Sequence, residues 1–150
     1  MCRLSFKYPK NVRFRCEFCT LCCRDTESRI RHILLLKSEA NHISRETSIE
    51  INKFAEEILG FEPYVYQMKK TEDGRCIFLK GDSCSIYSIR PLICRFYPFQ
   101  LKSLRKGMYI FTYTNECPGI GRGAELKRSF FEKLFRMFMK SMKEDAWVYP

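Results

Sequence analysis

The sequence has little histidine, with only His32 and His42 among its 150 residues. It offers no recognisable Ser/His/Asp set, Cys/His dyad or catalytic pair of carboxylates, and neither a GxGxxG nor a Walker-type glycine motif. These absences argue against a hydrolytic enzyme and against a nucleotide-binding protein. The catalytic residues, and whether the protein is an enzyme, stay unassigned from the sequence.

Long apolar runs are missing as well. The first eight residues lack an apolar run and a cleavage site, and no stretch reaches a membrane-spanning length. We therefore expect no signal peptide, no transmembrane segment and a cytoplasmic location, where thiols stay reduced. Repeats, low-complexity segments and linkers are also absent, so residues 1–150 are predicted to form a single metal-binding domain.

Cysteine, in contrast, is abundant. Four of the nine cysteines fall within eight residues, at Cys16, Cys19, Cys22 and Cys23. Two residues between thiols let the sulfurs turn toward one centre, a spacing used by tetrahedral Zn²⁺ and by iron–sulfur clusters. We expect Cys16, Cys19 and Cys22 to be able to share a centre, whereas the adjacent Cys22 and Cys23 need not bind the same metal. A disulfide framework or buried apolar cysteines are the alternative, disfavoured because nothing marks the chain as secreted.

A second set of cysteines comprises Cys76, Cys84, Cys94 and Cys117, whereas Cys2 stands apart and is not expected to be a ligand. Eight cysteines divided as 16/19/22/23 and 76/84/94/117 would fill two four-ligand sites, or one cluster and one zinc site. Three cysteines at two-residue spacings with a distant fourth favour an iron–sulfur cluster, of the 4Fe-4S type, over zinc alone.

Two arginines and a glycine-rich stretch accompany the second set. Arg90 and Arg95 flank Cys94 and are predicted to neutralise a metal–thiolate centre or hold an anionic group, with ordinary surface ion pairs as the alternative. Cys117 is followed by Gly119, Gly121 and Gly123 and then by a predicted helix. This order resembles an anion-binding loop, and we expect the amides of Gly119 and Gly121 to approach the sulfurs of a cluster.

Short strand patterns alternate with helix patterns, which predicts an α+β fold: a small antiparallel sheet with helices, cysteine-rich metal-binding loops and a long C-terminal amphipathic helix. The capping-box sequence Thr47-Ser48-Ile49-Glu50 predicts a helix that stops at Gly60. Trp147 is expected to pack back on the domain. The strands are expected at residues 30–36, 64–69, 75–79, 100–104 and 108–114, and the other helices at residues 38–45, 91–96 and 124–144.

The cysteine blocks resemble the YkgJ-type cysteine-cluster family of zinc- or iron-chelating domains, which is related to the flagellin lysine N-methylases. The resemblance covers roughly residues 14–123, and the chain departs from the family at Thr20-Leu21, where a glycine is usual. It implies metal or iron–sulfur binding and, more distantly, methyl transfer. The blocks are Phe14-Arg15-Cys16-x-x-Cys19-x-x-Cys22-Cys23, Cys76-x-Phe78-Leu79, Cys84-x-Ile86-Tyr87-x-x-Arg90-Pro91-x-x-Cys94-Arg95-x-Tyr97-Pro98-Phe99 and Cys117-Pro118-Gly119.

Basic residues outnumber acidic ones, 27 to 17, giving a net charge of +10. The surplus lies in the two cysteine-bearing segments, where part of it would balance thiolate charge. Two hypotheses follow. The first is an iron–sulfur protein, with or without a zinc site, that has a redox or methyl-transfer-type role. The second is a structural zinc module that binds a protein or a nucleic acid through its basic surface.

Overall fold

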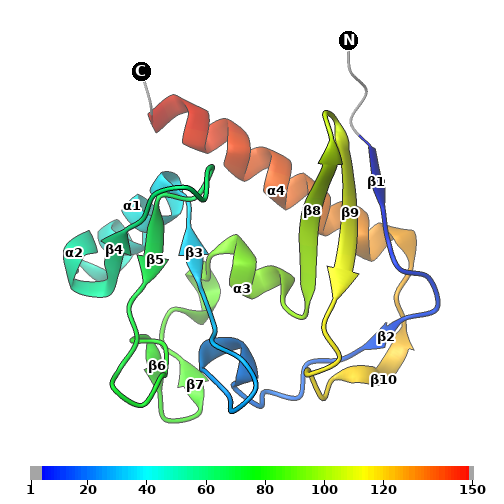
Figure 1. Ribbon diagram of the computed structural model, residues 1–150, viewed down its shortest axis with the longest axis horizontal. Helices are drawn as coiled ribbons and strands as arrows, with labels where there is room; N and C mark the ends of the chain where they lie inside the picture. The colour runs from blue at the N-terminus through cyan, green and yellow to red at the C-terminus, as the bar shows by residue number, and fades with distance from the viewer. Residues whose placement is uncertain (1–4, 149–150) are drawn as a thin grey trace.

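The computed structural model describes the backbone of residues 5–148 and the side chains of residues 5–144 (Figure 1). Cys2, which was not expected to be a ligand, and the side chain of Trp147, which was expected to pack on the domain, lie outside this part. The elements follow in the order β1 (Ser5–Lys7), β2 (Arg13–Phe14), η1 (Leu21–Cys23), β3 (Leu34–Leu35), α1 (Lys37–Thr47), α2 (Ile51–Phe54), β4 (Ala55–Glu57), β5 (Tyr66–Met68), β6 (Leu79–Lys80), β7 (Ser83–Cys84), η2 (Tyr87–Ile89), α3 (Leu92–Phe96), β8 (Phe99–Arg105), β9 (Met108–Tyr113), β10 (Ile120–Glu125) and α4 (Arg128–Val148).

Within the described residues the strands form four small sheets, which confirms the α+β class. The largest has the order β1-β9-β8, and its β8–β9 hairpin is antiparallel, whereas β1 lies parallel to β9. The second three-stranded sheet has the antiparallel order β3-β5-β4. Two-stranded pairs, β10-β2 and β6-β7, complete the set. The sequence predicted a small antiparallel sheet, and the structure divides it into these pieces.

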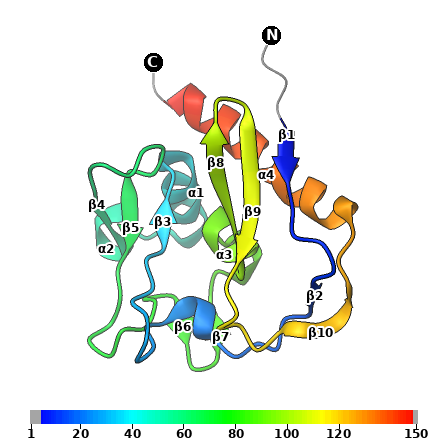
Figure 2. The same cartoon turned by 45° about the vertical axis from the view of Figure 1, so that its right-hand side comes forward.

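Helix α4 contributes its apolar side chains to one of the two hydrophobic clusters of the described residues. The amphipathic pattern of the helix predicts that these side chains are buried. Phe131 is fully buried against Phe99 and Phe111, with ring centroids 5.2 and 5.3 Å away. The helix crosses behind β8 and β9, and its C-terminal half reaches α1 (Figures 1 and 2). It begins at Arg128, four residues later than expected, because residues 120–125 pair as β10. No helix in the described part is long and apolar enough to cross a membrane.

The second cluster surrounds β3, β5, α1 and α2 and includes cysteines. Ile33, Leu35, Ile43 and Phe54 are each at most 3% exposed within it. The cysteine-bearing loops gather at the end of the molecule opposite α4, around β6, β7 and the start of β10 (Figure 1). The fold therefore places the metal-binding motifs at one end of the structure.

The expected helix over residues 47–60 is wrong. Only one turn forms, Ile51–Phe54, after which Ala55–Glu57 pairs with β5. Phe54 and Ala55 are buried, but Leu59, which also fits the helical pattern, is 91% exposed. The gain from strand pairing outweighs the local helix signal, as tertiary context often does. The strand expected over residues 30–36 is likewise reduced to Leu34–Leu35, and that over residues 75–79 to Leu79–Lys80.

Candidate metal centre

The structure brings five cysteines together: Cys22, Cys23, Cys76, Cys84 and Cys94, here called the five-cysteine group. The side chains of Cys23, Cys76, Cys84 and Cys94 all pack in the second hydrophobic cluster. Cys22 joins them through Cys23, since the two sulfurs are 3.6 Å apart. This group combines the end of the first cysteine run with three of the four later cysteines.

Backbone hydrogen bonds explain the convergence. The amide of Cys76 donates to the carbonyl of Cys23 at 2.6 Å, so the two segments run side by side. Cys84 faces Leu79 in the β6–β7 hairpin, which turns at Gly81 with φ +63°. Pro91 immediately precedes α3 and the helix then presents Cys94, as the sequence predicted. The cysteines thus reach one place from four separate segments.

The thiols of this group influence each other electrostatically. Burial raises the pKa of Cys76, Cys84 and Cys94, and the neighbouring thiolates raise each of them further. The pKa of Cys22 is lowered, because the Cys23 thiol shares a hydrogen bond with it and because Arg31 and Arg90 are positively charged. The same contact raises the pKa of Cys23. A cation placed among these sulfurs would relieve the repulsion between thiolates.

Arg31 is the main basic partner of the group, and sequence reasoning missed it. It is the one buried charged residue in the described part, at 6% exposure. Its Nε donates to the carbonyl of Cys22 at 2.9 Å and a terminal nitrogen donates to the carbonyl of Ile93 at 3.5 Å. Its charge contributes to the lowered pKa of Cys22 and offsets part of the rise that burial causes in the pKa of Cys94. Arg31 therefore ties the first cysteine run to α3.

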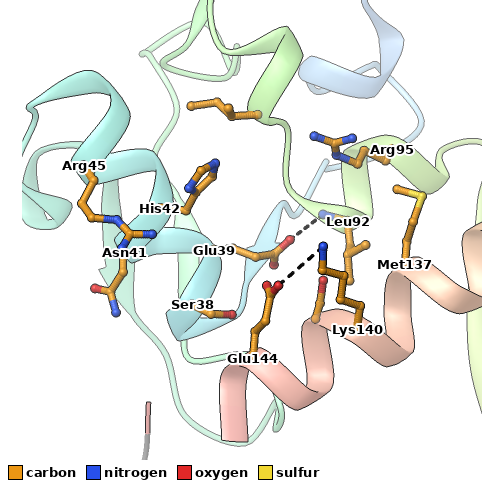
Figure 3. Close-up of a pocket in the computed structure, with 12 residues that line it drawn as sticks. Ser38, Glu39, Asn41, His42, Arg45, Leu92, Arg95, Met137, Lys140 and Glu144 are labelled. Atoms are coloured by element: carbon orange, nitrogen blue, oxygen red, sulfur yellow. Dashed lines mark hydrogen bonds and ion pairs between the residues drawn. The ribbon is translucent and has the colours of Figure 1, made fainter. Parts of the chain in front are cut away.

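The two arginines predicted from the sequence differ in position. Arg90 lowers the pKa of Cys22 and Cys84, and its guanidinium lies 3.8 Å from the Tyr87 ring centroid, so it belongs beside the five-cysteine group. Arg95 donates to the carbonyls of Arg90 and Ser88 at 2.8 and 2.9 Å. It also lines a groove between α1, α3 and α4 (Figure 3). Its contacts are those of a residue that stabilises the η2–α3 turn.

Glu39 in that groove links α1 to the cysteine-bearing helix. One carboxylate oxygen accepts a hydrogen bond from the amide of Leu36 at 3.0 Å. The other accepts one from the amide of Leu92 at 2.6 Å (Figure 3). These amides lie at the N-termini of α1 and α3, where backbone donors lack partners within the helix. Glu39 thus satisfies a backbone donor at the start of each helix.

The other three described cysteines, Cys16, Cys19 and Cys117, form a second set, here called the three-cysteine group. Cys16 is exposed, Cys19 is half-buried and Cys117 is buried. Burial raises the pKa of Cys117, and the Cys19 and Cys16 thiolates raise it further, which places the three near one another. The pairing of β2 with β10 unites them.

The two predicted glycines play different roles here. The carbonyl of Gly119 accepts the amide of Arg15 at 3.1 Å, and the amide of Gly119 lowers the pKa of Cys117 by hydrogen bonding. Gly119 thus lies beside the three-cysteine group, and its role toward a cluster stays a prediction. Gly121 lies in β10 with φ +90°, and an added Cβ would meet nothing within 4 Å. The anion-binding loop at a helix N-terminus is wrong, because Gly121 and Gly123 lie in the strand β10 and Gly119 lies in the turn before it.

A left-handed turn separates the two groups within the first cysteine run. Phe18 and Thr20 have φ of +55° and +67°, a conformation uncommon outside glycine. The amide of Cys23 donates to the carbonyl of Thr20 at 2.9 Å, which begins η1. The chain therefore reverses between Cys19 and Cys22, and Cys22 lies with Cys23 rather than with Cys16 and Cys19.

The donor chemistry of both groups fits a thiophilic metal, although no three His, Cys, Asp or Glu side chains in the described part stand in ready metal-binding geometry. Thiolate sets suit Zn²⁺, Cu(I) and iron–sulfur clusters, and none of the eight cysteines is tied up in a disulfide. Four of the five grouped cysteines would complete an all-sulfur site. The three-cysteine group supplies three ligands.

Comparison with known proteins agrees with this chemistry. Residues 15–118 match the family CxxCxxCC, described as "Putative zinc- or iron-chelating domain". The match covers more than half of the chain, and the protein belongs to this family. It is also 29% identical over 109 residues to "Uncharacterized protein MJ0661" of Methanocaldococcus jannaschii, covering 71% of this chain and 55% of that protein. The chain thus spans about half the length of this relative. No solved structure matches it.

Proposed function

We propose that this protein binds an iron–sulfur cluster, of the 4Fe-4S type, through the five-cysteine group and a second metal, zinc, through the three-cysteine group. The observation that carries the proposal is the convergence of Cys22, Cys23, Cys76, Cys84 and Cys94 from four segments into one group, in which Cys76 is buried and the others are half-buried. A cluster needs four thiolates. The fifth thiol, one of the adjacent pair Cys22 and Cys23, would hydrogen-bond to a ligand sulfur.

The surroundings of the five-cysteine group support this assignment. A cluster with four thiolates is negatively charged, and the cations of Arg31 and Arg90 lie beside it. When bound, a cluster supplies one-electron chemistry. Arg31 would hold the carbonyls of Cys22 and Ile93, fixing the directions of the ligands on η1 and α3. The apolar neighbours Ile33 and Phe78 would keep water away. A redox or methyl-transfer-type role follows as the proposed use.

The three-cysteine group suits a different metal role. Three protein ligands with one open position are typical of zinc sites that exchange a ligand, whereas structural zinc sites have four. The exposure of Cys16 leaves that open side near the solvent. Thiolates in this position require a reducing compartment such as the cytoplasm.

A second candidate function is a structural zinc module with a basic binding surface. The observation in its favour is a groove along α4 that includes Lys133, Arg136 and Lys140 together with the single carboxylate of Glu132. Such a surface attracts nucleic acid or an acidic protein. In this version zinc would occupy both cysteine groups and only organise the loops.

Anaerobic purification separates the two candidates. The cluster proposal expects a brown protein with about four iron and four sulfide per chain and a broad absorption band that reduction bleaches. A colourless protein with stoichiometric zinc and no acid-labile sulfide would contradict it and leave the zinc module. Variant Cys84→Ser should lose the iron, and the matched Cys19→Ser should keep it.

A further inference from the structure

A cavity of about 510 Å³ lies between the edge strands β3 and β8, with α3 next to it. Its walls come from the segment before β3, from β5, from α3 and its C-terminal end, and from β8. This volume is within the range of pockets for small organic molecules. The lining includes Arg29, Ile30, Arg31, His32, Phe61 and Tyr97.

One buried hydrogen-bond donor on the cavity wall has no partner. Tyr97 Oη makes no hydrogen bond in the described part of the chain, and Tyr97 lines this cavity. Arg29 lines it too, but its Nε forms an ion pair with a carboxylate oxygen of Glu116 at 2.7 Å, and a terminal nitrogen donates to the carbonyl of Leu21 at 2.7 Å. Buried donors without partners are rare in folded proteins and call for an explanation.

The charge of the wall is one-sided. Arg29 and Arg31 are both cationic, and none of the described residues lining the cavity is acidic, although Glu116 outside the lining forms an ion pair with Arg29. The rim has the opposite character: Ile30 and Phe61 are 64% and 57% exposed, although both are large and apolar. A ligand with an anionic group at the cationic wall and an apolar body at the rim would match both parts of the cavity.

We propose that this cavity binds a small organic oxyanion, a carboxylate or phosphate carried on an apolar body. The anionic oxygens accept hydrogen bonds from Tyr97 Oη and from the Arg29 guanidinium, and the apolar body rests on Ile30 and Phe61. The guanidinium of Arg29 lies 5.6 Å from the Tyr97 ring centroid, so both donors address the same space.

The cavity lies next to both cysteine groups, whichever metals these groups hold. Arg31 lines the cavity and donates to the carbonyl of Cys22, and Ile93 on the wall precedes Cys94. Cys117 is close enough to Tyr97 to raise the pKa of its hydroxyl. A bound oxyanion would therefore lie between the five-cysteine and three-cysteine groups.

Isothermal titration of the full chain, with its metals as purified, tests the proposal with benzoate and phenyl phosphate as probes. We expect saturable binding of at least one probe and about tenfold weaker binding of benzamide, the neutral counterpart of benzoate, because charge-assisted hydrogen bonds are lost. Raising the salt concentration should weaken binding. The stronger of the two probes identifies the oxyanion, and binding of inorganic phosphate as tight as phenyl phosphate would contradict a role for the apolar rim.

Variants Arg29→Gln and Tyr97→Phe should each weaken binding by about fivefold or more. The matched control is Arg24→Gln, because Arg24 comes from the same segment but does not line the cavity and should stay within about twofold. Metal content and melting temperature are measured for every variant. The proposal is wrong if wild type binds none of the probes or binds benzamide as well as benzoate. It is also wrong if Tyr97→Phe lowers the metal content, since the hydroxyl would then serve a metal centre.

Discussion

The two cysteine groups differ in their relation to the hydrophobic core. Four of the five-cysteine group pack among core residues such as Ile33 and Phe78, and Arg31 is buried beside them. The three-cysteine group lies in the segments next to the short β2–β10 pair, and Cys16 is exposed. Cysteines are thus gathered once against the core and once outside it.

Because of this difference, we expect one group to affect the folding of the protein and the other to exchange its metal with the solvent. A metal in the five-cysteine group would cross-link four segments that also form a core, so its binding free energy would become folding free energy. A metal in the three-cysteine group would join only the first cysteine run to the start of β10. We therefore expect the first group to control stability and the second to exchange its metal more readily.

The largest expected effect comes from removing one ligand of each group. Cys94→Ser should lower the free energy of unfolding by about 4 kcal/mol or more, because a metal and its cross-link are lost from the core. Cys16→Ser should cost about 1 kcal/mol or less, because its neighbourhood is open to solvent. Thermal melting together with metal analysis measures both. Equal losses of stability in the two variants would contradict the distinction between the groups.

Substitution of the buried arginine tests whether the environment of the five-cysteine group matters as well as its ligands. Arg31→Met removes donors from the carbonyls of Cys22 and Ile93 inside the core and should cost about 2–3 kcal/mol. Arg95→Met, which frees the carbonyls of Ser88 and Arg90 in a more open place, should cost about 1 kcal/mol. Urea unfolding gives both values, and a larger loss for Arg95→Met would reverse our assignment of their roles.

The glycines near the three-cysteine group provide a matched pair. A Cβ on Gly119 would lie 2.2 Å from the carbonyl oxygen of Arg15, so Gly119→Ala must shift the β2–β10 pair and should cost about 2 kcal/mol. Gly121→Ala has free space and carries only the strain of φ +90°, about 1 kcal/mol. Melting curves compare them. Similar melting temperatures would indicate that the pair β2–β10 adjusts freely.

The smallest effect concerns the metal-free protein. Burial raises the pKa of Cys94 above its unfolded value of about 8.5, so the folded state favours the neutral thiol. This contribution to stability is present below that pH and is lost as the pH rises through the folded pKa. Iodoacetamide should label the exposed Cys16 faster than Cys94 at pH 7.5, and labelling of Cys94 should accelerate at higher pH. Mass spectrometry of the labelled peptides measures the rates; faster labelling of Cys94 than of Cys16 is the contrary result.

The sequence predicted the elements whose signals are local and strong. The β8–β9 hairpin, the short helix presenting Cys94 and the long C-terminal helix are all confirmed within a few residues. The helix over residues 47–60 failed because Ala55–Glu57 pairs with β5, a partner that local pattern cannot reveal. The parallel pairing of β1 with β9 joins residues 5–7 to residues 108–110, which are far apart in the sequence, and left no local signal.

The candidate site, like the fold, could be predicted from the sequence only in part. Spacing identified the eight cysteines as a set, and the proposed ligands remain a prediction. Their division could not be read from spacing, because it depends on the left-handed Thr20, a residue type that gives no warning of such a turn. Arg31 was missed for a similar reason: it lies among the basic residues Arg29 and His32, and only burial distinguishes it.

The left-handed turn at Thr20 also keeps two metal centres near one another. Only two residues separate Cys19 from Cys22, so their Cα atoms lie at most about 11 Å apart, comparable with the Debye length in the cell. Two charged centres held this close would change each other's affinity, and thermodynamic linkage requires the change to be the same factor in both directions. A titration that fills one group would then report on the state of the other, even though the two share no ligand.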